Sequence, residues 1–302
     1  MAIITNTEAA DIIPTFWLNE VIQRLNANMV VSALVRRDFS AETASKGDTV
    51  NIMKRGAVTV RDKAQGTPIT SDAPENDKIP VVLDKHKYIS WAIEDNTSSK
   101  ALDEGLNYLE DAVPALAEQI EKDVLDMYAN IAMQHGTAGQ ALGIDDILEV
   151  RKMLNEKRCP QTGRIFVVST KDEIELLKLD QFIASNVRGA EGATALREAS
   201  LGRIHGFDFY MSQLTPVVAG TPDTTHNLAF HPRALCLTSR AIAQPPQGAG
   251  VISQVIVDPM TGMAFRYTQG YSIKDQATIH TVDVLYGVAA IESDTLAVDV
   301  IS

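Results

Sequence analysis

The clearest regularity in the chain is the spacing of apolar residues between positions 109 and 134. They recur at intervals of three or four, the period of one face of an α-helix, at Leu109, Val113, Leu116, Ile120, Val124, Met127 and Ile131. Pro114 would lie in the first turn, where a proline loses no helical hydrogen bond, and Gly136 would end the helix. The pattern predicts one long helix with a buried stripe, and it places Glu121 just outside that stripe.

A second helical stripe lies near the N-terminus, within residues 1–46. Its apolar members follow Pro14 and are Phe16, Trp17, Val21, Ile22 and Leu25. Such a helix could pack in the core of its own domain, or it could belong to an arm that reaches a neighbouring subunit. The pattern alone leaves both interpretations open.

Alternating apolar residues predict two strands, at 48–53 and 79–93. The stretch between them, residues 61–78, is polar, carries Pro and Gly, and offers little apolar surface. Together these segments predict a long two-stranded loop. Because an isolated ribbon is only marginally stable in water, we expect the loop to lie on another surface, either of its own domain or of a neighbour.

The remaining sequence mixes helix and strand patterns, which is typical of an α+β fold. A short helix is predicted at 98–111, a second helix at 144–156, and a third where a capping box opens at 170–173. A Gly- and Ala-rich stretch at 185–200 predicts a loop. Strands are predicted at 165–168, 207–211, 227–230, 251–257, 263–269 and 277–301, the last interrupted by Gly287.

The composition indicates a folded, acidic protein. The chain has 302 residues, of which 45% are hydrophobic, a mean hydropathy of −0.04 and a formal net charge of −12. This charge argues against general nucleic-acid binding, although an acidic wall can surround nucleic acid without adhering to it. No apolar run is long enough to span a membrane, so no membrane partner is expected. Cys159 and Cys236 fit no ligand spacing and are predicted to be buried thiols.

Motifs for catalysis or cofactor binding are missing from the sequence: it has no Walker loop, nucleophile elbow, His-Glu-x-x-His or Cys-x-x-Cys. Asp145 and Asp146 form a carboxylate pair, but at a predicted helix start they are expected to be capping residues. His226 and His231 have a spacing that could suit a metal, with ordinary surface histidines as the alternative. We therefore predict no enzyme, no cofactor, and no catalytic, cofactor-binding or metal-ligating residue.

Taken in order, several stretches resemble the major capsid protein of tailed bacteriophages, in the Podovirus-coat-like branch of the Hong Kong 97-type fold. Residues 78–87, KIPVVLDKHK, resemble the returning strand of that family's extended loop, and residues 114–125, PALAEQIEKDVL, resemble its spine helix. Residues 201–207, LGRIHGF, with 228–234, LAFHPRA, resemble its axial domain, and residues 284–288, VLYGV, its closing strand.

The resemblance implies an α+β fold with four parts. Residues 1–46 would form an N-terminal arm, and residues 47–95 an extended β-loop (E-loop). Residues 96–136 and 258–302 would form a peripheral domain that contains the spine helix. Residues 137–257 would form an α/β axial domain.

The same resemblance implies a structural role. Copies of the chain would self-assemble as hexamers and pentamers into the icosahedral head shell of a virion, in the cytoplasm of a bacterial host. The implied partners are other copies, a scaffolding protein, a portal protein, a decoration or cement protein, and packaged double-stranded DNA held without sequence-specific binding. Two alternatives stay open: an encapsulin-like nanocompartment shell, which shares the fold, and an oligomeric α/β enzyme without a recognisable motif.

Overall fold

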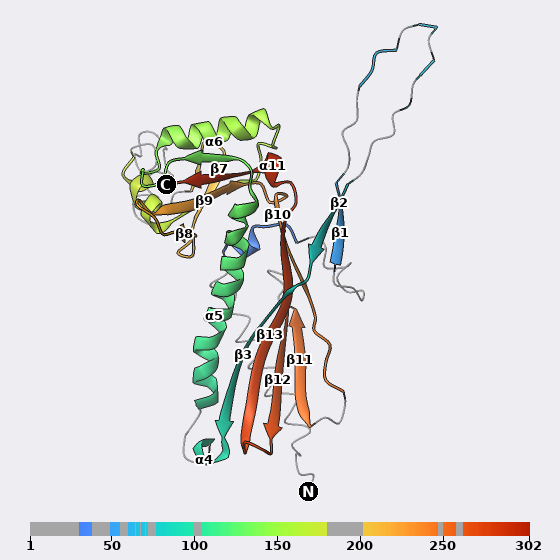
Figure 1. Cartoon of the computed structure of the whole chain (residues 1–302), viewed down its shortest axis with the longest axis vertical. Helices are drawn as coiled ribbons and strands as arrows, with labels where there is room; N and C mark the ends of the chain where they lie inside the picture. Colours follow the sequence, from blue (N-terminus) through green and yellow to red (C-terminus); the bar gives the residue numbers. More distant parts are fainter. Residues whose placement is uncertain are drawn as a thin grey trace.

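The molecule is elongated, with one β-sheet near each end and the long helix α5 (Glu104–Leu125) running between them (Figure 1). This arrangement is seen in a computed structural model. Side chains are described for the same residues as the backbone except 97–98, 104–114 and 256. The backbone is described for residues 30–37, 49–54, 60–63, 65–66, 68–69, 71, 77–98, 104–179, 202–246, 250–257 and 262–302.

The first sheet is built on strand β13, which pairs antiparallel with three other strands. Because β3 and β12 both pair with residues 277–284, they lie along opposite edges of β13, and β10 pairs with residues 285–290. Strand β11 pairs with β12, which confirms the predicted hairpin. The members are β3 (Lys85–Glu94), β10 (Leu235–Arg240), β11 (Val251–Val257), β12 (Ala264–Ser272) and β13 (Ala277–Ala290).

The second sheet has β5 near its centre, between parallel β7 and antiparallel β9. All five residues of β5 are buried, which confirms the prediction of an apolar central strand. In sheet order the strands are β4 (Gln134–Gly136), β14 (Ala297–Ile301), β9 (Thr224–Phe230), β5 (Arg164–Val168), β7 (Phe207–Met211) and β6 (Arg203–Ile204), with β8 (Val217–Val218) paired to β9.

Two helices pack with the second sheet, and both were predicted. Helix α6 (Ile144–Glu156) has the predicted bounds. The N-cap of helix α7 (Thr170–Leu177) is Ser169, one residue before the predicted cap Thr170. The Ser169 Oγ accepts a hydrogen bond from the Asp172 backbone N–H at 3.1 Å, which satisfies one of the free donors of the first turn.

The assignment of strands to the two sheets does not follow the order of the strands along the chain. Strands β10 and β11 fall within the range 137–257, yet they pair in the sheet of β13. Strands β4 and β14 come from the ranges 96–136 and 258–302, yet they pair in the sheet of β9. The chain passes from β13 through α11 (Ser293–Leu296) directly into β14, so it crosses between the sheets more than once.

The long helix differs from its prediction at both ends. It begins at Glu104 and continues through Pro114, so the short helix predicted at 98–111 is largely the start of α5. It ends at Leu125 and is followed by the 3-10 helix η2 (Asp126–Asn130), after which Ile131 is extended. The apolar spacing continued to Ile131, but the tighter 3-10 turn and β4 take over there, so the α-helical prediction to position 134 was wrong.

The predicted stripe of the helix is buried. Leu116, Ile120, Val124 and Ile131 are each 4% exposed or less, and Met127 packs partly buried against the same core. This core is continuous and contains aromatic residues of both sheets, among them Phe166, Phe230, Phe265 and Tyr286. Helix α5 therefore joins the two sheets through one apolar core.

Glu121 was predicted to lie outside the buried stripe, and this was wrong. Its side chain is 1% exposed, because the segment containing η1 (Val31–Ala33) packs on that side of the helix and donates hydrogen bonds to its carboxylate. A single helical stripe identifies one buried face, and here a second segment covers an adjacent face.

Replacing Ile120 with Asp should strongly destabilise the fold. Ile120 is 0% exposed, and an unpaired charge at such a position costs about 3–5 kcal/mol. The free energy of unfolding, measured by denaturant titration, should fall by this amount, or the variant should be recovered as insoluble protein. Glu118→Lys, on the exposed side of the same helix, should change it by less than about 0.5 kcal/mol. Equal stability of the two variants would contradict the buried position of α5.

Candidate assembly surfaces

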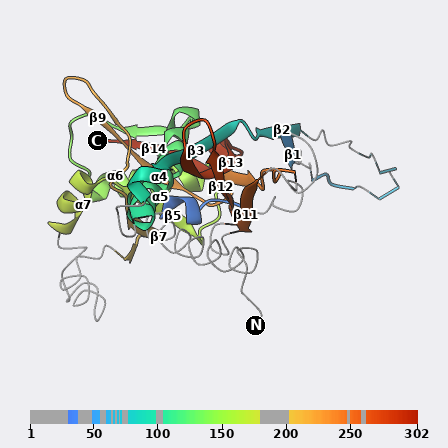
Figure 2. The same cartoon turned by 90° about the horizontal axis from the view of Figure 1, so that it is seen from below.

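A two-stranded ribbon leaves the body of the molecule (Figures 1 and 2). It consists of β1 (Thr49–Lys54) and β2 (Asp77–Val82), paired antiparallel from Thr49↔Val82 to Lys54↔Asp77. The first predicted strand is confirmed, whereas the second, at 79–93, divides after Val82. Its second half is β3, which pairs with β13 instead. The alternation of buried and exposed residues continues through both halves, so the pattern alone could not reveal the division.

The base of this ribbon is fixed to its own subunit. Val50, Ile52 and Val81 form a small apolar cluster with Cys236 of β10 and Ile291, directly after β13. The backbone also approaches closely at Gly287: a Cβ placed there would lie 2.1 Å from the carbonyl oxygen of Val82. The prediction that Gly287 interrupts the last strand was wrong, because β13 continues through it. The glycine instead allows the ribbon to pass directly over β13.

Apolar side chains are exposed near the end of β1 and in the described residues between β1 and β2. Met53 is 64% exposed, Val60 94% and Ile69 77%. Several apolar residues left uncovered on one extended element indicate a contact surface. The subunit thus holds the base of the ribbon and presents the rest of its described residues outward.

The segment of residues 30–37 packs into its own subunit. Val31 and Val35 belong to the main core, and the backbone N–H of Arg36 donates to the carbonyl oxygen of Leu235 at 3.1 Å. These residues of the predicted arm therefore pack in the core of their own subunit. The helical stripe predicted from Phe16 to Leu25 lies outside the described residues.

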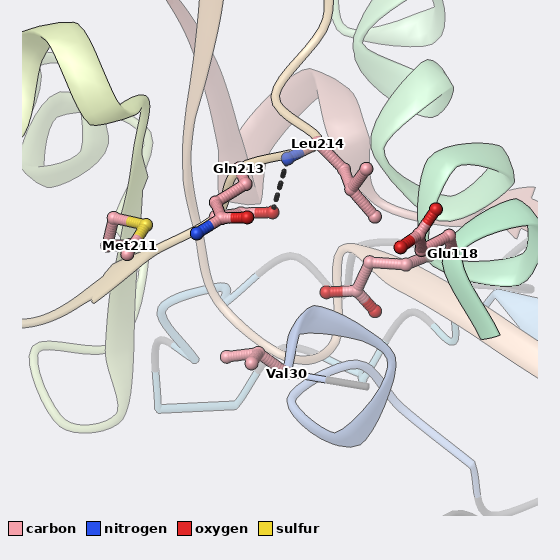
Figure 3. Close-up of a pocket in the computed structure, with 7 residues that line it drawn as sticks. Val30, Glu118, Met211, Gln213 and Leu214 are labelled. Atoms are coloured by element: carbon pink, nitrogen blue, oxygen red, sulfur yellow. Dashed lines mark hydrogen bonds between the residues drawn. The ribbon is translucent and has the colours of Figure 1, made fainter. Parts of the chain in front are cut away.

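A cavity of about 240 Å³ lies beside this segment, between α5 and the loop that follows β7 (Figure 3). Glu118 and Glu121 line it from the helix, and Val30 lines it from the segment of residues 30–37. The remaining lining comes from the end of β7 and from the loop, where the Leu214 N–H donates to the Ser212 Oγ at 3.3 Å. The lining residues are Val30, Glu118, Glu121, Met211, Ser212, Gln213 and Leu214.

A buried carboxylate connects α5 to the first sheet. Asp123 accepts hydrogen bonds from the Tyr286 hydroxyl at 2.6 Å and from Gln119 Nε2 at 2.9 Å, and Lys85 Nζ lies 3.2 Å away. Burial by itself raises the pKa of Asp123, but the hydrogen bonds from Tyr286 and Lys85 and the charge of Lys85 outweigh burial, so the pKa is lowered. Asp123 therefore stays ionised at neutral pH and connects α5 with β13 and β3.

The residues considered for chemistry have structural roles. His226 is 7% exposed, lies 2.9 Å from Asp299 Oδ2 through its Nδ1, and stacks on Tyr128 at 4.0 Å between ring centroids. Asp146 accepts a hydrogen bond from the Gly143 N–H at 2.9 Å, as expected for a capping residue. His231 instead accepts from the backbone N–H of Arg233 at 3.2 Å.

Within the described ranges, no group of three or more His, Cys, Asp or Glu residues could hold a metal ion. Over the same residues, no helix is long and apolar enough to span a membrane. Cys159 and Cys236 are both buried and form no disulfide, as predicted.

Comparison with known proteins gives matches at the level of structure. No family model and no curated protein matches the chain. A chain from the structure of Mycobacterium phage Che8 matches with a TM-score of 0.69 at 21% identity, covering 90% of this chain and 91% of that chain. The capsid structure of cyanophage P-SCSP1u matches with a TM-score of 0.65 at 15% identity, covering 90% and 87%.

A virus-like particle from Pyrococcus furiosus also matches, with a TM-score of 0.55 at 8% identity, covering 94% of this chain and 97% of that chain. At these low sequence identities, the structural matches show a shared fold and nothing more. The chain therefore has the fold of phage capsid proteins, and the predicted α+β class is confirmed.

Replacing Gly287 with Ala should displace the base of the ribbon. The added methyl group would overlap the backbone of Val82, and relieving such an overlap costs about 1–3 kcal/mol. Hydrogen exchange should become faster in β1 and β2, and the melting temperature should fall. Gly270→Ala is a matched control on neighbouring β12, because its Cβ would meet a side-chain methyl of Val251 at 3.3 Å, which can move. Equal effects of the two changes would contradict the close approach at Gly287.

The Asp123 contact should make stability depend on acid pH. Because the pKa of Asp123 in the folded state lies below its ordinary value of 3.8, its contribution is complete above about pH 4 and is lost as the pH falls through the folded-state pKa. Near neutral pH, the free energy of unfolding of the wild type should exceed that of Asp123→Asn by about 2 kcal/mol. Urea titrations at several pH values should show this difference shrinking below about pH 4. A difference that stays constant down to acid pH would contradict an ionised Asp123.

Proposed function

We propose that this chain is a major capsid protein that self-assembles into the icosahedral head shell of a tailed bacteriophage and encloses double-stranded DNA. The observation that carries the proposal is the match of the fold over 90% of the chain to phage structures, including a capsid. The fixed ribbon base with exposed apolar residues farther out supports it, because a shell subunit must offer surfaces to neighbours. The role is structural and not enzymatic.

The same proposal assigns a role to each part of the chain. Residues 1–46 act as an arm, 47–95 as the extended loop, 96–136 with 258–302 as the peripheral domain, and 137–257 as the axial domain. Most strands of the first sheet belong to the proposed peripheral ranges and most of the second to the axial range; β10 and β11, and β4 and β14, are the strands that pair in the other part's sheet.

The partners follow from the same role. Other copies of the chain would form hexamers and pentamers, and a scaffolding protein, a portal and a decoration or cement protein would join them. The location would be the virion, with assembly in the bacterial cytoplasm. The formal net charge of −12 suits a wall that surrounds DNA without adhering to it.

A nanocompartment shell of encapsulin type is the alternative with the same fold. It receives less support, because the two matches described above with the higher TM-scores are phage structures. An oligomeric enzyme has no supporting feature in the sequence beyond the presence of an α/β region.

Electron microscopy of the purified full-length chain, expressed with and without candidate scaffolding proteins, tests the proposal. Closed icosahedral shells with pentamers and hexamers are the expected result. Analysis of particles purified from phage-infected cells should find double-stranded DNA inside. Particles filled with an enzyme would favour the nanocompartment. A monodisperse monomer or dimer under all conditions would contradict a shell protein.

A further inference from the structure

Strand β11 is the last strand on one side of the first sheet, the side away from α5 (Figure 1). It pairs with β12 along one of its edges. Within the described residues, no backbone hydrogen bond from another segment reaches its second edge. The loop at 241–246 that leads to β11 is attached elsewhere, because Arg266 donates to the Ala243 carbonyl oxygen. The second edge of β11 therefore offers backbone N–H and C=O groups to a further strand.

The residues of β11 make this edge apolar. The strand reads VISQVIV and contains no charged residue, no Pro and no Gly. Val251 is 38% exposed, Ile252 39% and Val257 57%. Natural sheets keep other chains away from an open edge with charged residues, Pro or bulges, and the pairing of β11 with β12 runs without a bulge. Because β11 has none of these protections, its edge is suited to pairing with another strand.

The opposite side of the same sheet is protected. There β3 carries Lys85, Lys87 and Glu94, and helix α5 packs beside it (Figure 1). Charged residues and a covering helix are two of the usual ways in which a protein prevents a further strand from pairing. The sheet is thus protected on the β3 side and open on the β11 side.

The order of residues in β11 favours a second copy of the same strand as the partner. When two copies run antiparallel with Gln254 opposite Gln254, position 251 of each copy faces position 257 of the other, and position 252 faces position 256. These pairs are Val with Val and Ile with Ile. Facing β-branched residues stabilise a strand pair, whereas facing like charges would destabilise it. The strand is therefore self-complementary, which is what a two-fold interface requires.

We propose that β11 is a docking edge for β11 of a second copy of the chain, so that two first sheets join into one continuous sheet across a two-fold axis. Main-chain hydrogen bonds would hold the two strands together, and the facing apolar side chains would set their register. The proposal rests on the proposed function, because an icosahedral shell places copies of the chain around two-fold axes. The contact is separate from the ribbon, whose strands β1 and β2 pair with each other in a different sheet.

Charges placed at positions 251 and 257 test the register. Both side chains are exposed, and six residues along a strand separate them by about 20 Å within one subunit, whereas in the proposed pair they face each other. Val251→Lys with Val257→Lys sets Lys opposite Lys twice, so the shell yield, measured by sedimentation and electron microscopy, should fall about tenfold. Val251→Lys with Val257→Glu is the matched control and should stay within about twofold of wild type, because Lys then faces Glu. Equal yields of the two double variants would overturn the proposal.

A disulfide at position 254 tests which segment occupies the edge. Facing residues of antiparallel strands have Cα atoms about 4.5–5.5 Å apart, which a disulfide can bridge. Gln254→Cys should therefore give linked dimers on oxidation of purified particles, read on a non-reducing gel. Val251→Cys is the matched control on the same strand and should stay unlinked, because its copy lies about 20 Å along the partner strand. The native Cys159 and Cys236 are buried and should not contribute. No link at Gln254→Cys, or equal linking of both variants, would overturn the proposal.

The edge pairing and the capsid function can fail separately. Shells of Gln254→Cys that contain no linked dimers would overturn the edge pairing and leave the capsid function standing. A density map of such shells that shows a ribbon or a scaffolding protein along β11 would overturn it in the same way. Linked dimers of the purified chain without any shell would support the edge pairing and contradict the capsid function.

Discussion

Strand β13 is the element on which the rest of the structure depends. Its residues pair with β3 along one edge and with β12 and β10 along the other. It also offers Tyr286 to Asp123 of α5 and the glycine at 287 that lets the ribbon pass over it. It then leads through α11 into β14 of the second sheet. The ribbon, the long helix and both sheets are therefore positioned relative to this one strand.

The joints between these elements share a physical feature, a buried carboxylate whose oxygens are satisfied by donors from distant parts of the chain. Glu121 joins α5 to the segment at Val31, and Asp123 joins α5 to β13. Asp299 of β14 joins His226 of β9, and there burial raises the pKa of Asp299 against the opposing effect of His226. Such groups contribute little net stability but penalise any other arrangement. For a proposed shell subunit, whose neighbours are placed by its geometry, a unique arrangement matters more than additional stability.

The same arrangement accounts for the side chains that the sequence offered for chemistry. The acidic and histidine side chains considered for chemistry are used in caps and in internal pairs. Exposed apolar side chains are found between β1 and β2, at Val60 and Ile69, and also on helices, at Leu148 and Ile174. The proposed shell subunit would recognise its partners through shape and apolar area, and no short sequence motif records either property.

The sequence by itself determined the elements whose signals are local. The apolar spacing around Ile120, the five-residue buried strand β5, and the hairpin of β11 and β12 could all be predicted, because side-chain periodicity and turn residues act over a few positions. The order of these elements also sufficed to suggest the fold. Only the tertiary structure decided that residues 79–93 divide between the ribbon and a sheet, that Gly287 lies beneath Val82, and that Glu121 is buried. Each of these depends on a contact between residues far apart in the chain, and a pattern read along one segment contains no information about which distant segment will cover it.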